Sequence, residues 1–259
     1  MGETSAISWC DSTANPEMGC HGCELWDPKR GIRICYAGVL TERILQRVSV
    51  KGWPPAFDQP TLFPGRIEAA CAWKDLTGTK RPLKPWLDGR PRVIFLNDMG
   101  DTFTAGLPLD WLAPYLPMMG RAPHLWLILT KHPARAAEFS RLHLLPPNVY
   151  IGTSVTGQQD PRVRHLQRVR ASLIFVSYEP VLRGADPKPW LEGPAGINWL
   201  IVGGASGAQS VAPDVDDYRR VVERCREYRR PVFVKQDAAR RPETQGRIPD
   251  ELFVREFPK

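Results

Sequence analysis

The succession of apolar segments constrains the fold of this sequence more than any other feature. Beyond residue 90 the chain alternates continuous apolar runs with helix-like stretches, and many of its 26 prolines stand between the runs. Continuous apolar runs are typical of parallel strands that are covered on both faces. The strong strand predictions are residues 92–97, 124–131, 149–155, 173–179, 198–203 and 231–236. Strands that alternate with helices predict an α/β domain.

Weaker patterns add to this alternation. Short strands are expected at residues 7–10 and 61–63, and helices at 36–48, 66–73, 109–119 and 214–228, with Asp214 near the start of the last helix. About eight strand–helix units would favour a single (β/α) barrel, full or partial and TIM-like, spanning residues 1–259. An open doubly wound sheet is the main alternative fold.

Polar residues follow most of the predicted strands at the end where each strand finishes. In a β/α barrel these positions share the carboxyl-terminal rim, where active sites are built. The candidates are Asn97, Asp98, Asp101, Thr130, Lys131, Ser154, Glu179, Gly203, Gly204, Ser206 and Lys235. The sequence therefore predicts a functional site at this rim.

Three cysteines lie close together near the amino terminus, in a predicted metal-binding loop at residues 10–36. Cys20 and Cys23 form a CxxC pair, and Cys35 follows after eleven residues. Three thiolates suit a [4Fe-4S] cluster that leaves one iron open for a small molecule. A closed zinc site would need a fourth ligand, which Cys10 would supply. The remaining cysteines, Cys71 and Cys225, fall in predicted helices and are expected to be small core residues.

Composition narrows the cellular setting and the partners. The net charge of +7 favours polyanionic partners such as nucleic acid. No apolar run approaches the roughly 18–20 residues of a membrane span, and residues 1–6 lack the apolar core of a signal peptide. Six cysteines are too few for a disulfide scaffold in a chain of 259 residues. We therefore expect a cytoplasmic protein that does not insert into a membrane.

Several motifs in this sequence are familiar. The segments ISWCDSTANPEMGC, CYAG, FLNDMGDTF, LTKHPAR, IGTSVTGQQD, FVSYEPVL, LIVGGASG and PVFVKQ run in order along nearly the whole chain. Together they resemble a phage- and prophage-associated family of three-cysteine proteins of unknown function. That family is in turn similar to radical S-adenosylmethionine (radical SAM) enzymes, although the usual spacing there is CxxxCxxC rather than the spacing found here.

This resemblance implies a radical-SAM-type barrel in which Cys20, Cys23 and Cys35 hold a [4Fe-4S] cluster. The open iron would bind S-adenosyl-L-methionine, and reductive cleavage would yield a 5′-deoxyadenosyl radical. Such chemistry implies an electron donor of the flavodoxin or ferredoxin type. The residues that would contact the cofactor are Asn97, Asp98, Asp101, Thr130 and Ser154.

The substrate prediction comes from the last strands and from the charge. Exposed backbone in the turn at Gly203, Gly204 and Ser206 would cradle a phosphate, with Lys131 or Lys235 as a counter-charge. Glu179 would orient the substrate or move a proton, and Lys235 is the second candidate catalytic residue. A nucleotide or a DNA or RNA base is the expected substrate, and phage association implies DNA modification or repair.

Two other classes of function remain open at this point. One is a nucleic-acid-binding accessory protein that zinc or an iron–sulfur cluster stabilises. The other is a barrel hydrolase or nuclease in which Asp98, Asp101 and Glu179 bind a divalent metal.

Overall fold

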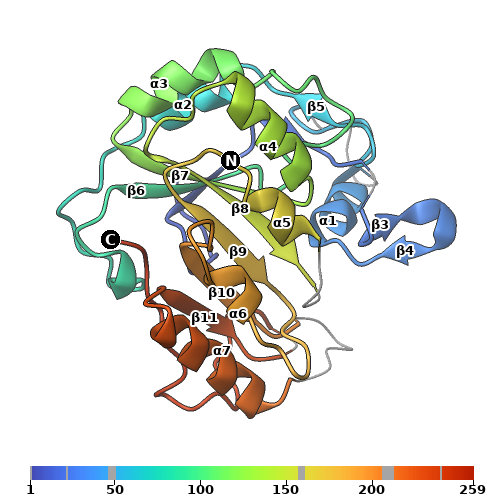
Figure 1. The fold of residues 1–259 in the computed structure, drawn as a ribbon. Helices are drawn as coiled ribbons and strands as arrows, with labels where there is room; N and C mark the ends of the chain where they lie inside the picture. Colours follow the sequence, from blue (N-terminus) through green and yellow to red (C-terminus); the bar gives the residue numbers. More distant parts are fainter. Residues whose placement is uncertain (1, 22, 46–50, 157–160, 206–212, 240) are drawn as a thin grey trace.

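A computed structural model describes the chain except residues 1, 22, 46–50, 157–160, 206–212 and 240 (Figure 1). Its centre is a seven-stranded, wholly parallel sheet in which the strands stand in chain order. They are β1 (Ser12–Ala14), β6 (Arg92–Leu96), β7 (His124–Thr130), β8 (Val149–Val155), β9 (Ile174–Tyr178), β10 (Trp199–Gly203) and β11 (Val232–Gln236). The sheet curls into a half-barrel with β1 and β11 at its edges. A doubly wound sheet would reverse the strand order at a switch point, so that alternative is wrong.

The strand predictions from residue 92 onward are confirmed to within two residues at each end. The prediction of a strand at residues 7–10 is wrong, and seven strands rather than about eight form the sheet. Residues 7–10 form a turn, in which the Cys10 N–H donates to the Ile7 carbonyl at 3.4 Å. The Lys84 ammonium binds the carbonyls of Ser5, Ile7 and Cys10 at 2.7, 2.7 and 2.5 Å. These carbonyls are therefore held by a side chain instead of a neighbouring strand.

Helices cover the outer face of the half-barrel (Figure 1). They are α2 (Arg66–Cys71), α3 (Leu116–Arg121), α4 (Pro133–Leu142), α5 (Arg162–Leu166), α6 (Lys188–Leu191) and α7 (Val215–Glu227). The Asp214 carboxylate accepts the Asp216 N–H at 3.2 Å, as expected for the start of α7. The helix predicted at residues 109–119 is instead a 3₁₀ turn, Ala113–Tyr115, followed by α3. Pro114 and Pro117 lack the N–H groups that a longer helix would need there.

Alternate residues of the strands pack on opposite faces of the sheet, which gives the protein two cores. Ile94 and Leu96 of β6 point outward beneath the helices, whereas Val93 and Phe95 point into the half-barrel. The inner core is rich in aromatic rings, and the rings of Trp199 and Phe257 lie 4.5 Å apart. The half-barrel is thus filled by side chains rather than open as a channel.

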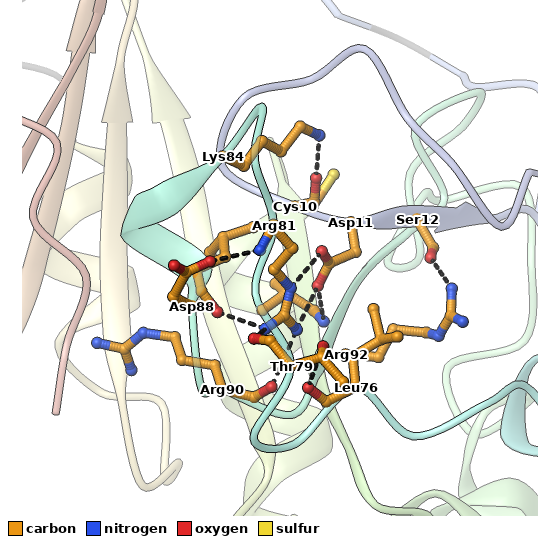
Figure 2. A network of polar contacts seen from close by, with 12 residues as sticks. Cys10, Asp11, Ser12, Leu76, Thr79, Arg81, Lys84, Asp88, Arg90 and Arg92 are labelled. Atoms are coloured by element: carbon orange, nitrogen blue, oxygen red, sulfur yellow. Dashed lines mark hydrogen bonds and ion pairs between the residues drawn. The ribbon is translucent and has the colours of Figure 1, made fainter.

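A polar network closes the half-barrel where β1 and β6 begin (Figure 2). The Arg81 guanidinium donates to the Asp11 carboxylate at 2.9 Å and to the carbonyls of Leu87 and Arg90 at 2.6 and 2.9 Å. Asp11 also accepts the Val93 N–H at 2.8 Å, which ties the network to the sheet. Both charged side chains are buried. This arrangement fixes the amino end of the half-barrel.

The long connection between β1 and β6 carries the cysteines and two small antiparallel pairs of strands. One pair is β2 (Glu17–Met18) with β5 (Thr61–Leu62), and the other is β3 (Trp26–Asp27) with β4 (Ile32–Arg33), joined by a 3₁₀ turn. The strand predicted at 61–63 therefore exists outside the main sheet. The predicted helix at 36–48 is α1 (Tyr36–Leu45), and residues 46–48 lie outside the described residues. The β3–β4 hairpin projects past α1 (Figure 1).

Candidate functional site

Three thiols gather in the connection that follows the carboxyl end of β1. Cys20 comes just after β2, Cys23 pairs with Trp26 at the base of the hairpin, and Cys35 precedes α1. All three are partly buried and share one apolar cluster, whose buried members are Met18, Trp26, Ala37, Phe57 and Met99. The structure therefore brings together the three cysteines that were predicted to be ligands.

The other cysteines lie elsewhere. Cys10 is fully buried in the inner core, on the far side of β1 from Cys20, and burial raises the pKa of its thiol to about 12. Cys71 and Cys225 pack in the outer core, as predicted. A thiol that remains protonated in an apolar core is a poor metal ligand. This placement argues against Cys10 as the fourth ligand of a closed zinc site.

The thiols of Cys20 and Cys23 share a hydrogen bond that shifts their pKa values in opposite directions. The bond lowers the pKa of Cys23 to about 6, helped by the Leu25 N–H and the Lys131 ammonium, although burial works against them. The same bond raises the pKa of Cys20, and burial raises it further. Burial also raises the pKa of Cys35, while the N–H groups of Gly38 and Ala37 in α1 partly offset it. One thiolate is therefore ready near neutral pH for a soft metal.

Lys131 links the thiols to the sheet. Its backbone N–H donates to Asp101 at 2.7 Å, and its ammonium is near enough to lower the pKa values of Cys23 and Cys35. That ammonium has no hydrogen-bond or ion-pair partner in the part of the chain that the structure describes. Lys131 thus places a positive charge near the thiols, and the same charge helps to lower the pKa of Glu24.

A second potential ligand set overlaps the first at Cys20. One donor atom each from Cys20, Asp101 and His132 lies within 4.8 Å of the other two. The Asp101 carboxylate also accepts the Thr130 hydroxyl at 2.6 Å, and His132 Nε2 is buried without a hydrogen-bond partner among the described residues. Sulfur, oxygen and nitrogen donors at this separation can hold one transition-metal ion. His132 was not among the residues predicted from the sequence, because its only signal there is its position directly after a strand end.

Asn97 and Asp98 have their polar groups engaged within the fold. Asn97 adopts a left-handed backbone conformation, with φ of 62°, and its side chain accepts the Glu17 N–H at 3.1 Å. The same side chain donates to the Thr102 hydroxyl at 2.8 Å, so Asn97 positions the cysteine loop. Asp98 accepts the Asn15 amide at 2.7 Å. A direct role of Asn97 in binding a cofactor would require these bonds to break.

Glu17 is the most unusual acid in this region, and the sequence analysis did not single it out. The residue is fully buried, and neither carboxylate oxygen has a well-formed hydrogen bond among the described residues. Burial raises the pKa of this carboxyl well above its usual value, and the nearby Asp101 carboxylate raises it further. A buried acid without a partner is destabilising and marks a place built for something other than stability.

Five predicted rim residues lie on the inward-facing rows of their strands. The alternation that points Leu129, Phe175 and Phe233 inward sets the orientation of these rows. The residues are Lys131, Ser154, Glu179, Gly203 and Lys235. Because the strands are parallel, all five stand at the same end of the sheet, as predicted.

An ion pair occupies the last strands of this row. Lys235 Nζ and Glu179 Oε2 are 2.8 Å apart, and Ser177, which the sequence analysis did not name, donates its hydroxyl to Glu179 at 2.9 Å. Burial alone would lower the pKa of Lys235, but the Glu179 carboxylate outweighs it and raises that pKa. The pair can hold a proton or a charge at the mouth of the half-barrel.

The glycine turn after β10 has a structural role at Gly204. Its N–H donates to the Gln236 carbonyl at 2.9 Å, so this N–H is not free to bind a phosphate. A Cβ at Gly204 would lie 2.3 Å from the Ala238 nitrogen, which explains the glycine by close approach of two backbones. Ser206 lies outside the described residues, and its predicted phosphate contact stays a prediction.

The fold and the site together define an α/β protein with a parallel half-barrel and a loop of three thiols at the end of the sheet where the strands finish. Residues 4–258 match the family described as "Protein of unknown function (DUF5131)", and the chain belongs to this family. No match was found among curated proteins or among solved structures. No helix in the described ranges is long and apolar enough to cross a membrane.

Proposed function

We propose that this protein is a radical-SAM-type [4Fe-4S] enzyme that modifies a nucleotide or a nucleic-acid base. The observation that carries the proposal is the gathering of Cys20, Cys23 and Cys35 at the carboxyl end of a parallel half-barrel, while Cys10 is buried elsewhere. Three thiol donors without a fourth cysteine beside them fit a cluster with one open iron. The proposal also draws on the resemblance of the sequence motifs to radical SAM enzymes.

The chain's own residues fit such a group chemically. Cys23 supplies a thiolate near neutral pH, and the Lys131 ammonium offsets the negative charge that three thiolates would gather. When bound, the cluster would supply the electron for reductive cleavage of S-adenosylmethionine. Lys131, near Cys23 and Cys35, and Ser154 at the end of β8 are suited to bind polar groups of the cofactor or the substrate.

The far side of the mouth is suited to handle the substrate. The Glu179 carboxylate, held by Ser177 and Lys235, is placed to orient a substrate or to exchange a proton with it. The aromatic inner core beneath this row excludes water from the floor of the site. The net charge of +7 supports a phosphate-bearing substrate.

The test is a cysteine series in protein that is purified and reconstituted without oxygen. Cys20→Ala, Cys23→Ala and Cys35→Ala should each lose most of the iron and sulfide and all formation of 5′-deoxyadenosine. Cys10→Ala and Cys71→Ala should keep both, because neither thiol lies in the ligand cluster. If Cys10→Ala loses metal like Cys23→Ala, or if the loaded wild type binds no S-adenosylmethionine, the proposal is wrong.

A second candidate is a metal-dependent hydrolase with one ion at Cys20, Asp101 and His132, favoured by the 4.8 Å grouping of their donor atoms. The predicted set of Asp98, Asp101 and Glu179 forms no such grouping among the described residues, and Asp98 accepts from Asn15 and Glu179 from Lys235 instead. In the hydrolase, His132→Ala should remove the metal, while Cys23→Ala and Cys35→Ala should keep it. In the proposed radical-SAM-type enzyme, Cys23→Ala and Cys35→Ala should lose the metal and His132→Ala should keep it.

A further inference from the structure

The β3–β4 hairpin places positive charge beside the cysteine loop. Lys29 and Arg30 at its turn are exposed, and neither side chain has an ion-pair partner in the part of the chain that the structure describes. Arg33 on β4 is half exposed and lies 3.4 Å from Glu42 of α1. A projecting element with unpaired basic side chains is suited to a polyanion.

Exposed apolar side chains lie where this hairpin meets α1. Ile34 is 71% exposed and Tyr36 is 58% exposed, although each is next to Cys35 in the chain. The Tyr36 hydroxyl donates to the Asp98 carbonyl at the end of β6, so the ring is held in place. A fixed aromatic ring that remains open to solvent is a platform on which a nucleobase can stack.

These features meet the proposed reaction site at one edge of the half-barrel. Tyr36 joins the cysteine loop to the end of β6, and the unpaired Lys131 ammonium lies by Cys35 at the end of β7. Arg162 ties the hairpin side to β8, because it donates to Glu24 at 2.7 Å and to the Ser154 carbonyl at 2.9 Å. A polynucleotide lying along the hairpin would therefore reach the cysteine loop at the base of the hairpin.

We infer that the β3–β4 hairpin and Tyr36 bind a single-stranded polynucleotide, with Lys29 and Arg30 on its phosphates and Tyr36 stacked on one base. The inference rests on the proposed function and names its substrate as a strand rather than a free nucleotide. A single strand is favoured over a duplex, because bases within a duplex are stacked on each other and cannot cover Tyr36 without being extruded.

The first test measures charge. Binding of fluorescein-labelled oligo-dT and oligo-U is followed by anisotropy over a range of salt concentrations. Lys29→Ala/Arg30→Ala should weaken binding and reduce the slope of log K against log salt by about 1.4, which is the value for two lost single-strand phosphate contacts. The matched control is Lys74→Ala/Lys80→Ala, which removes the same charge from exposed positions ahead of β6, at the opposite end of the sheet. The control should keep the wild-type slope.

The second test measures stacking. Tyr36→Leu should weaken binding by about 5- to 150-fold, the range for losing one base–aromatic stack. Tyr36→Phe keeps the ring but loses the bond to Asp98 that holds it in place, so it should weaken binding less than Tyr36→Leu does. Iron and sulfide content is measured on each variant, so that loss of binding is not confused with loss of the neighbouring Cys35 ligand.

Three results would overturn the inference: equal salt slopes for the hairpin and control variants, tighter binding to a matched duplex, or binding to phosphatidylserine vesicles without binding to oligonucleotides. Formation of 5′-deoxyadenosine without added substrate separates this failure from failure of the proposed function. Formation of 5′-deoxyadenosine by a protein that does not bind the single-stranded oligonucleotides would refute only the inference. Strand binding in a protein that holds no iron would refute only the proposed function.

Discussion

Two polar regions flank β1, and they differ in whether their buried polar groups have partners. Ahead of the strand, Arg81 donates hydrogen bonds to the Asp11 carboxylate, and Lys84 donates to backbone carbonyls (Figure 2). Beyond the strand, both carboxylate oxygens of Glu17 are buried and lack a hydrogen-bond partner among the described residues. Buried polar groups that have partners specify and hold a structure, whereas buried polar groups without partners are tolerated where something must bind. The comparison separates an end of the half-barrel that is held by paired charges from the end that carries the proposed site.

The largest effect should come from breaking the structural end. Arg81→Met removes the partner of a buried Asp11 carboxylate and should lower the free energy of unfolding by about 3–5 kcal/mol. Urea unfolding followed by tryptophan fluorescence measures this change. Arg81→Met/Asp11→Asn should recover part of the loss, because it leaves no unpaired charge. A loss below about 1 kcal/mol in the single variant would show that the network is not structural.

A substitution of Glu17, at the other end of β1, should raise the stability of the protein rather than lower it. The pKa of Glu17 is raised above its ordinary value of 4.5 when the protein folds, so the folded state holds a proton that the unfolded chain has released. Wild-type stability should therefore fall as the pH rises above 4.5, and Glu17→Gln should not share this fall. Unfolding of metal-free protein at several pH values tests this. The advantage of Glu17→Gln over the wild type should grow with pH, and a constant difference would refute the burial argument.

The smallest effect concerns reactivity rather than stability. In metal-free, reduced protein, alkylation of Cys23 should show a midpoint near its pKa of about 6. Cys20→Ala should raise this midpoint most, because the Cys20 hydrogen bond is the main cause of the low pKa, and Lys131→Met should raise it less. Mass spectrometry of the labelled peptide gives the midpoint. Equal rates for Cys23 and Cys35 at pH 7 would contradict the assigned asymmetry.

The strands from β6 onward were predictable because each is a continuous apolar run that ends at a polar residue. The region before them was not, because its structure depends on contacts between distant residues. Residues 7–10 look like a strand, yet Lys84, more than 70 positions away, captures their carbonyls. Likewise, the run at 61–63 pairs with β2 rather than with the main sheet.

The site residues that could be predicted are those whose spacing in the sequence indicates their chemistry. Those whose role depends on burial could not be predicted. The three clustered cysteines could be identified from their spacing, and Cys10 could be set apart only with the structure. Glu17 and His132 are ordinary residues in the sequence, and only the structure shows that each has buried polar atoms without a hydrogen-bond partner among the described residues. Gly204 appeared to be a phosphate-binding glycine, but a neighbouring backbone at 2.3 Å from a Cβ there accounts for it.

The placement of the cysteine loop between two paired strands has a consequence for the order of folding. Ser12 of β1 pairs with Ile94 of β6, whereas Ile94 pairs with Trp126 of β7, so the separations are 82 and 32 positions. Closing the longer loop costs about 0.8 kcal/mol more in chain entropy, at about 0.6 kcal/mol for each doubling. We expect β6–β11 to assemble first and β1 to dock last, carrying the thiols into place as it does so. In the proposed enzyme, metal loading would then be the step that completes folding, because the full-length chain would present its cysteines to a metal donor after the rest of the sheet has formed.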